Sequence, residues 1–94
     1  MRNGFIGVRN AFSIYPQGCI HIGWAGQSVI EIRDLIYNLF KEGYTHVILN
    51  YRPAGCIAPL RNIFHRSEYM DQSYIETMVE LEDKVDDTIN YLFN

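Results

Sequence analysis

Hydrophobic residues recur at every second position in the first quarter of the chain, which is typical of strands with one buried face. The pattern predicts strands over Phe5–Ile14 and Cys19–Ala25. Between them, Tyr15–Gly18 contains proline and glycine at the positions that suit a tight turn. Because the turn is so short, the two strands are expected to form an antiparallel hairpin.

The hydrophobic pattern then changes to helical spacing. Ser28 and Glu31 form a capping-box pattern, in which each side chain binds a free backbone N–H group of the first helical turn. Apolar residues follow every three or four positions, and Gly43 suits the left-handed residue that ends a helix. A third strand is predicted over Tyr44–Tyr51. Strand, helix and strand with short connections form a βαβ unit, whose two strands run parallel.

Two further helices are predicted in the C-terminal third. Pro59 suits the first turn of a helix, where a missing N–H group costs nothing. Leu60, Ile63 and Phe64 would form the buried stripe of that helix. A second capping-box pattern, Ser73 to Glu76, predicts the start of the last helix. Its apolar stripe consists of Tyr74, Met78, Leu81, Val85, Ile89 and Leu92.

These elements, in the order ββαβαα, predict a single domain over residues 1–94 of α+β or small α/β class. The sheet is expected to be mixed and three-stranded, with helices packed on it. The first helix is expected on one face, and the C-terminal helices on the other face or against a second subunit. Three strands leave two unpaired edges, and joining edges in a homo-oligomer is one solution. Seven tyrosines, many for so small a core, also favour a subunit or partner interface.

Composition and charge narrow the classes of partner. The chain is 48% hydrophobic, as globular proteins are, and its net charge of −3 argues against duplex nucleic acid as a partner. The sequence contains no run of 18 apolar residues, so it predicts no membrane span. The absence of a signal-peptide pattern and the presence of only two cysteines favour a cytoplasmic protein with reduced thiols.

Two loops suggest a ligand site. Trp24–Ser28 and Asn50–Cys56 each follow a predicted strand and precede a predicted helix. If the strands are parallel neighbours, both loops open at the carboxyl edge of the sheet, where open α/β sheets usually bind ligands. The first helix also directs its free N–H groups there, which favours an anion. The candidate ligand-binding residues are Trp24, Gly26, Gln27, Ser28, Asn50, Tyr51 and Arg52.

The first functional hypothesis is therefore a non-enzymatic protein that captures an anionic small molecule, of which a nucleotide is one candidate, without a cofactor. Arg52 would pair with the negative charge, and Trp24 or Tyr51 would stack on a planar group. Neither glycine-rich nucleotide-binding motif is present. The glycines can equally serve the turns, and Ser28 can serve only as a helix cap.

A second hypothesis is a protein–protein inhibitor, a kind of small protein common among phage and mobile-element accessory proteins. Six carboxylates on the last helix face a single balancing cation, Lys84, and exposed tyrosines would add to such an interface. The carboxylates are Glu76, Glu80, Glu82, Asp83, Asp86 and Asp87. A small basic stretch of Arg61, His65 and Arg66 suits an acidic partner. Either charged stretch can instead be a solvated face.

A third hypothesis is a small thiol enzyme with Cys56 as a weak catalytic candidate. Arg52 and Arg61 lie near Cys56 in the sequence and would lower the pKa of its thiol, although a small buried apolar role is more usual for such a cysteine. No metal site is predicted, because the cysteines and histidines lack the compact spacing of zinc ligands. The cysteines and histidines that could otherwise supply ligands are Cys19, His21, His46, Cys56 and His65.

Overall fold

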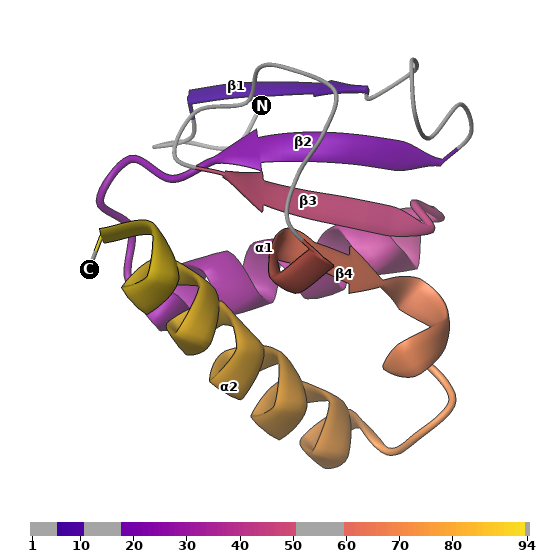
Figure 1. Ribbon diagram of the computed structural model, residues 1–94. Helices are drawn as coiled ribbons and strands as arrows, with labels where there is room; N and C mark the ends of the chain where they lie inside the picture. Colours follow the sequence, from indigo (N-terminus) through magenta and orange to yellow (C-terminus); the bar gives the residue numbers. More distant parts are fainter. Residues whose placement is uncertain (1–5, 11–17, 51–59, 94) are drawn as a thin grey trace.

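The sheet of this protein has four strands in the order β1-β2-β3-β4 (Figure 1). The computed structural model describes residues 6–10, 18–50 and 60–93. β1 (Ile6–Asn10) runs antiparallel to β2 (Cys19–Gly23), and β2 runs parallel to β3 (His46–Asn50). The predicted α+β class and its mixed core of three strands are thereby confirmed.

The first helix, α1, spans Val29–Glu42 and begins and ends as the sequence predicts. The amide of Glu31 donates to the Ser28 hydroxyl at 3.2 Å, and the amide of Ser28 donates to the Glu31 carboxylate at 2.9 Å. At the other end Gly43 has φ +111°, and its amide donates to the carbonyls of the last turn. These contacts satisfy backbone groups that the helix itself leaves unpaired.

The prediction of a helix starting at Pro59 is wrong for the described residues. Leu60–Asn62 forms a single 3₁₀ turn, η1, followed by β4 (Ile63–His65) and a second 3₁₀ turn, η2 (Arg66–Glu68). β4 pairs antiparallel with β3 and covers an edge that a three-stranded sheet would leave open. The alternate side chains of β4 then bury on opposite faces, which a helix of the same sequence could not achieve beside β3.

The second helix, α2, spans Tyr74–Phe93. Its capping box is confirmed, since the amide of Glu76 donates to the Ser73 hydroxyl and the amide of Ser73 to the Glu76 carboxylate. Neither α1 nor α2, the two α-helices in the described part of the chain, has the length and apolarity needed to cross a bilayer.

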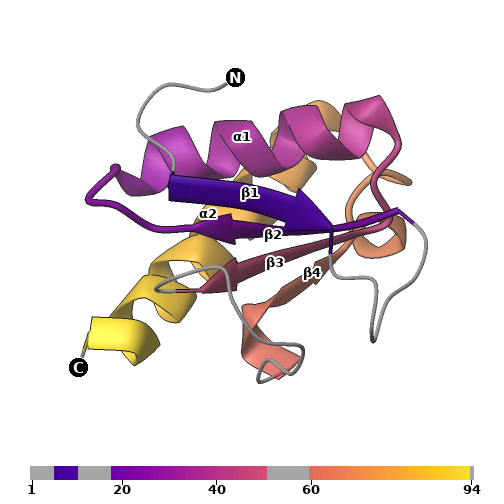
Figure 2. The same ribbon diagram turned by 90° about the horizontal axis from the view of Figure 1, so that it is seen from above.

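Both helices pack on the same face of the sheet, which corrects the expectation that the C-terminal helix covers the opposite face. Met78, Leu81 and Val85 of α2 belong to one buried cluster with the inward side chains of α1, β2, β3 and β4. Tyr69, which precedes α2, stacks on Phe40 of α1 with ring centroids 6.0 Å apart. This contact brings the chain to the α1 side of the sheet, where α2 lies beside α1 (Figures 1 and 2).

The opposite face of the sheet is also buried at its centre. Cys19, Ile48 and Ile63 form a second, smaller apolar cluster there. Because Val47 and Leu49 point into the main core and Ile48 into the second cluster, β3 is buried on both faces. A strand that is buried on both faces has a continuous run of apolar residues in its sequence, and Val47-Ile48-Leu49 is such a run.

Candidate functional site

The carboxyl ends of β2 and β3 meet at one edge of the sheet, as the parallel arrangement requires. Gly23 is the register partner of Asn50, and the amide of Trp24 donates to the Asn50 carbonyl at 3.0 Å. The Trp24–Ser28 loop therefore starts beside the end of β3. Of the predicted site residues, Tyr51 and Arg52 lie outside the described residues, as does the weak catalytic candidate Cys56.

The polar groups of the Trp24–Ser28 loop bind one another. The indole N–H of Trp24 donates to the Gln27 carbonyl at 2.9 Å, and the Gln27 side-chain oxygen accepts from the Ala25 amide at 2.7 Å. Glu31 adds an exposed carboxylate at the N-terminus of α1, where it offsets the positive end of the helix dipole. Gly26 has φ +92°, and no non-neighbouring heavy atom of the described residues lies within 4 Å of the position that a Cβ would take. The loop thus binds several of its own polar groups, and no described atom crowds Gly26.

The Asn50 side chain joins a polar network on the sheet. Its side-chain Nδ2 lies 3.3 Å from Nδ1 of His21, and its Oδ1 accepts from Nδ2 of Asn62 at 2.8 Å. His21 and Asn62 are buried. His21 is therefore a buried side chain with a polar contact in the sheet, and no sequence pattern pointed to Asn62 as its indirect partner.

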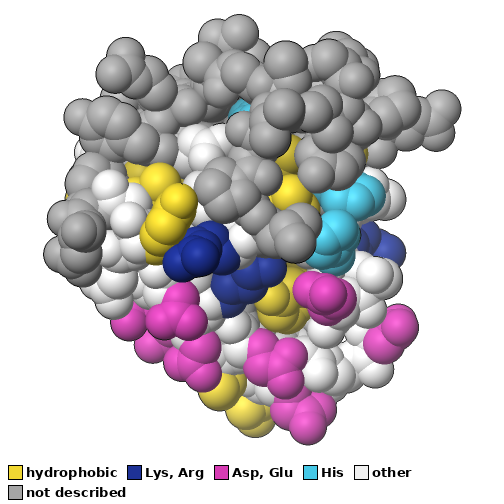
Figure 3. Space-filling view, in the orientation of Figure 1, with side chains coloured by type: hydrophobic (Ala, Val, Ile, Leu, Met, Phe, Trp, Pro, Cys, Tyr) yellow, Lys and Arg dark blue, Asp and Glu magenta, His cyan; other side chains and the backbone are white. Residues whose placement is uncertain are grey.

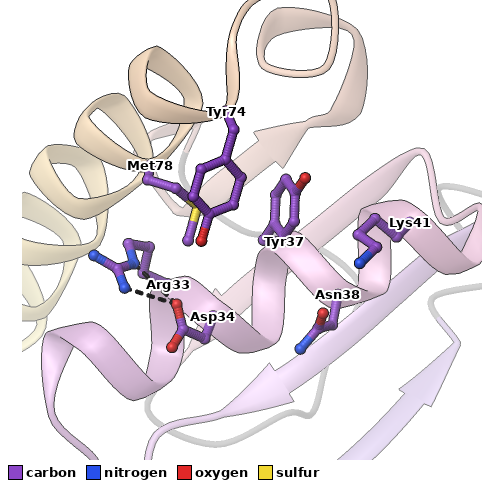
Figure 4. Close-up of a pocket in the computed structure, with 7 residues that line it drawn as sticks. All are labelled: Arg33, Asp34, Tyr37, Asn38, Lys41, Tyr74 and Met78. Carbon is purple, nitrogen blue, oxygen red and sulfur yellow. Dashed lines mark hydrogen bonds and ion pairs between the residues drawn. The ribbon is translucent and has the colours of Figure 1, made fainter.

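A groove of about 340 Å³ lies between α1 and the start of α2 (Figure 4). Two tyrosines form its aromatic wall: Tyr37 of α1 and Tyr74 of α2 meet edge to face, with ring centroids 5.3 Å apart. Figure 4 shows Arg33 and Asp34 at one end of the groove and Asn38 and Lys41 at the other. The lining residues are Arg33, Asp34, Tyr37, Asn38, Lys41, Tyr74 and Met78.

The two cations of the groove are in different electrostatic states. Arg33 donates to Asp34 from two nitrogens, at 2.8 and 3.0 Å, and to Glu82 at 3.0 Å. The hydrogen bond with Asp34 is the main cause that raises the pKa of Arg33, so its charge is fixed and paired. Lys41, in contrast, is exposed and lies 5.4 Å above the Tyr37 ring. The groove therefore offers an apolar wall with one solvated cation at its rim.

The outward surface of α2 combines apolar and acidic residues. Tyr74, Ile75 and Val79 are 59%, 73% and 55% exposed, although the sequence placed Tyr74 in the buried stripe. Five carboxylates of α2 are exposed beside them: Glu76, Glu80, Asp83, Asp86 and Asp87. Acidic side chains cover much of the lower half of the molecule in Figure 3, with hydrophobic side chains at its lower end. Exposed aliphatic residues one helical turn apart are a common feature of partner-binding helices.

The basic stretch does not form a continuous charged face. Arg61 stacks on the Tyr91 ring at 4.1 Å, and Arg66 donates from Nε to the carbonyl of Phe40 at 2.8 Å, near the end of α1. His65 lies next to His46 of β3, with ring centroids 4.7 Å apart. The contacts of these three side chains stabilise the fold, and the two arginines have partners within the chain.

His46 of this pair and its register partner Cys19 have perturbed pKa values. Burial lowers the pKa of His46, and the neighbouring His65 lowers it further. Burial raises the pKa of the Cys19 thiol, an effect that a side-chain hydrogen bond with Thr45 partly offsets. Among residues 6–10, 18–50 and 60–93, no group of three or more metal-ligating side chains converges on one point.

Comparisons with protein-family models, curated proteins and solved structures gave no match for this chain.

Proposed function

We propose that this protein is a non-enzymatic protein-binding module whose docking surface consists of the outer side of α2 and the adjoining groove between α1 and α2. The observation that carries the proposal is the exposure of Ile75 and Val79, one turn apart on α2. Tyr74 continues this apolar surface into the groove, where it packs against Tyr37. Contiguous exposed apolar residues with an aromatic anchor suit a protein partner better than a solvated surface.

The charge of the surface indicates the chemistry of the partner. Glu76, Glu80 and Asp83 are exposed on the same helix as the apolar residues. A partner with apolar anchors surrounded by Lys and Arg would complement both features. Two copies that met through α2 in a two-fold contact would bring like charges together, which disfavours that form of self-association. The proposed occupant is therefore a basic, amphipathic segment of another protein.

Fluorescence anisotropy with two labelled synthetic peptides tests the proposal. One peptide carries Lys and Arg around Leu and Trp, and the other carries Glu at each basic position. We expect only the basic peptide to bind. Its affinity should decrease as the salt concentration is raised from about 0.15 to about 1 M, because salt screens the charges. Equal binding of both peptides, or of neither, would overturn the proposal.

Variants of the docking surface sharpen the test. Replacing Ile75 and Val79 by Ser should weaken binding of the basic peptide by about tenfold or more, since central apolar contacts supply most of the affinity. Reversing the charges of Glu80, Asp83 and Asp87 should weaken it further and remove its salt dependence. Ile30→Ser, at an exposed apolar site on α1, is the matched control and should bind as the unaltered protein does.

Self-association is the competing outcome for this surface. Light scattering of the unaltered protein gives its molecular mass in solution. A dimer that the Ile75 and Val79 substitutions dissociate would show that a second copy occupies the surface, and would overturn the proposal of a basic partner. A mass that these substitutions leave unchanged supports it.

A second candidate function is capture of an anionic small molecule at the carboxyl edge. The parallel pairing of β2 and β3 favours it, because Trp24–Ser28 then opens beside the end of β3. In this proposal Arg52 pairs with the anion. A panel of nucleotides and inorganic phosphate should raise the melting temperature, and Arg52→Ala should remove the effect. An unchanged melting temperature with every anion would exclude this function.

A further inference from the structure

We propose that His46 and His65 form a two-imidazole binding site for a divalent transition-metal ion such as Zn²⁺, Ni²⁺ or Cu²⁺. The two residues are register partners across β3 and β4. Their rings lie on the face of the sheet opposite α1 and α2, because the neighbouring Val47 and Phe64 point into the main core. Imidazole nitrogen is a preferred ligand of these ions.

The separation of the rings suits a shared ion. An imidazole nitrogen binds Zn²⁺ at about 2.0–2.1 Å, which places the ring centroid about 3.2 Å from the ion. Two rings that subtend about 90–110° at the ion then have centroids about 4.5–5.2 Å apart. The observed separation between His46 and His65 is 4.7 Å. The ring planes meet edge to face at 70°, so the site requires the two side chains to rotate until both nitrogens face one ion. Both rings are only half-buried and β4 is an edge strand, which leaves room for this rotation.

Thr45 orients the ring of His46. Its hydroxyl oxygen lies 2.9 Å from Nδ1 of His46 and 3.3 Å from the Gly18 carbonyl. Metal-binding histidines commonly have the ring nitrogen that does not bind the ion held by a hydrogen bond to a neighbouring group.

The site is proposed with two protein ligands, and water would fill the remaining positions on the ion. Cys19 of β2 lies on the other side of His46 from His65, because it is the register partner of His46 across β2 and β3. Cys19 is only 2% exposed, so it is not assigned as a ligand. This assignment distinguishes the site from a structural zinc centre, which closes four positions with protein side chains.

Thermal unfolding with added ZnCl₂ or NiCl₂ tests the site. A Cys56→Ser background removes the thiol that lies outside the described residues. We expect both salts to raise the melting temperature in a saturable manner that EDTA reverses. Loss of an orienting partner typically weakens metal affinity by about 10–100-fold, so loss of a ligating ring should weaken it at least as much. His65→Gln and His46→Gln should each do so, while Ser67→Ala, an exposed neighbour on η2, should not.

Two further measurements separate the alternatives. Cys19→Ala should retain the ion-dependent shift, and loss of the shift in this variant would replace the two-imidazole site by a thiolate site. Proton NMR of the unaltered protein should show Ni²⁺ broadening the imidazole signals of His46 and His65 before that of His21. This measurement needs no variant to fold. The absence of a melting shift, or a shift that persists in His65→Gln, would overturn the proposal.

Discussion

Arg33 on α1 and Glu82 on α2 form an ion pair, with 3.0 Å between Nη1 and the carboxylate Oε1. The same guanidinium binds Asp34 of its own helix, so a single cation serves two carboxylates. Arg33 also lines the groove between the two helices. The ion pair therefore fixes one end of the groove and joins the two elements of the proposed docking surface.

A double-mutant cycle on Arg33→Gln and Glu82→Gln measures this link. Both side chains retain contact with water, which screens their attraction, so we expect a coupling energy of about 0.3–1 kcal/mol at low salt. Urea unfolding of the four proteins provides the values. The coupling should decrease in about 1 M salt. A coupling energy of zero at low salt would show that the ion pair does not connect the helices energetically.

The hydrogen bond between the buried Asn62 and the half-buried Asn50 leads to a second prediction. Asn62 is fully buried, and Asn62→Ala would leave the Asn50 oxygen without the donor that it has now. We expect the free energy of unfolding to fall by about 1–3 kcal/mol. Asn38→Ala, on the exposed side of α1, should change it by less than about 0.5 kcal/mol. Equal effects of the two substitutions in urea unfolding would contradict a structural role for Asn62.

Local signals in the sequence predict much of this fold. Three features depend only on residues that are close together in the sequence: the capping boxes at Ser28 and Ser73 and the glycine that ends α1. The structure contains all three. The parallel pairing of β2 and β3 follows from the βαβ rule. The 3₁₀ turn and strand at 60–65 do not follow from local signals. Ile63 and Phe64 pair with the open edge of β3, a partner distant in sequence.

The candidate surfaces were only partly accessible to sequence reasoning. The acidic side of α2 is visible as a charge pattern, but helical spacing placed Tyr74 inside the core, whereas the structure exposes it beside Tyr37. A periodic pattern identifies which side of a helix is apolar. It does not show how far along the helix the neighbouring elements cover that side. The adjacency of His46 and His65 depends on the register of β4. It could not be predicted while that segment was expected to be helical.

Gly18 connects the start of β2 to β3 and supports a third prediction. It has φ +68°, its carbonyl accepts from the amides of Thr45 and His46, and an added Cβ would lie 2.9 Å from the Thr45 hydroxyl. Gly43 has a positive φ as well, but an added Cβ there would meet no non-neighbouring atom of the described residues within 4 Å. Gly43→Ala should therefore cost about 1 kcal/mol from backbone strain alone.

Gly18→Ala should cost more, about 2–3 kcal/mol, because the steric clash adds to the strain. Urea unfolding gives both values. Repeating Gly18→Ala in a Thr45→Ala background removes the clashing oxygen and should recover part of the difference. If Gly18→Ala proved no more costly than Gly43→Ala, the close approach of β2 and Thr45 would not determine its effect.

The lowered pKa of His46 predicts how stability changes with pH. Burial, and then the neighbouring His65, favour the neutral ring in the folded protein, so its folded pKa lies below the unfolded value of 6.5. Between these two values the unfolded chain binds more protons, and the free energy of unfolding therefore falls as the pH is lowered through that window. The stabilising contribution is fully present above pH 6.5.

Urea unfolding in EDTA at successive pH values should show this loss of stability at low pH, and His46→Gln should reduce the loss. His65→Gln should also reduce it in part, because that substitution removes the neighbouring charge. An unchanged pH dependence in His46→Gln would show that another group is responsible.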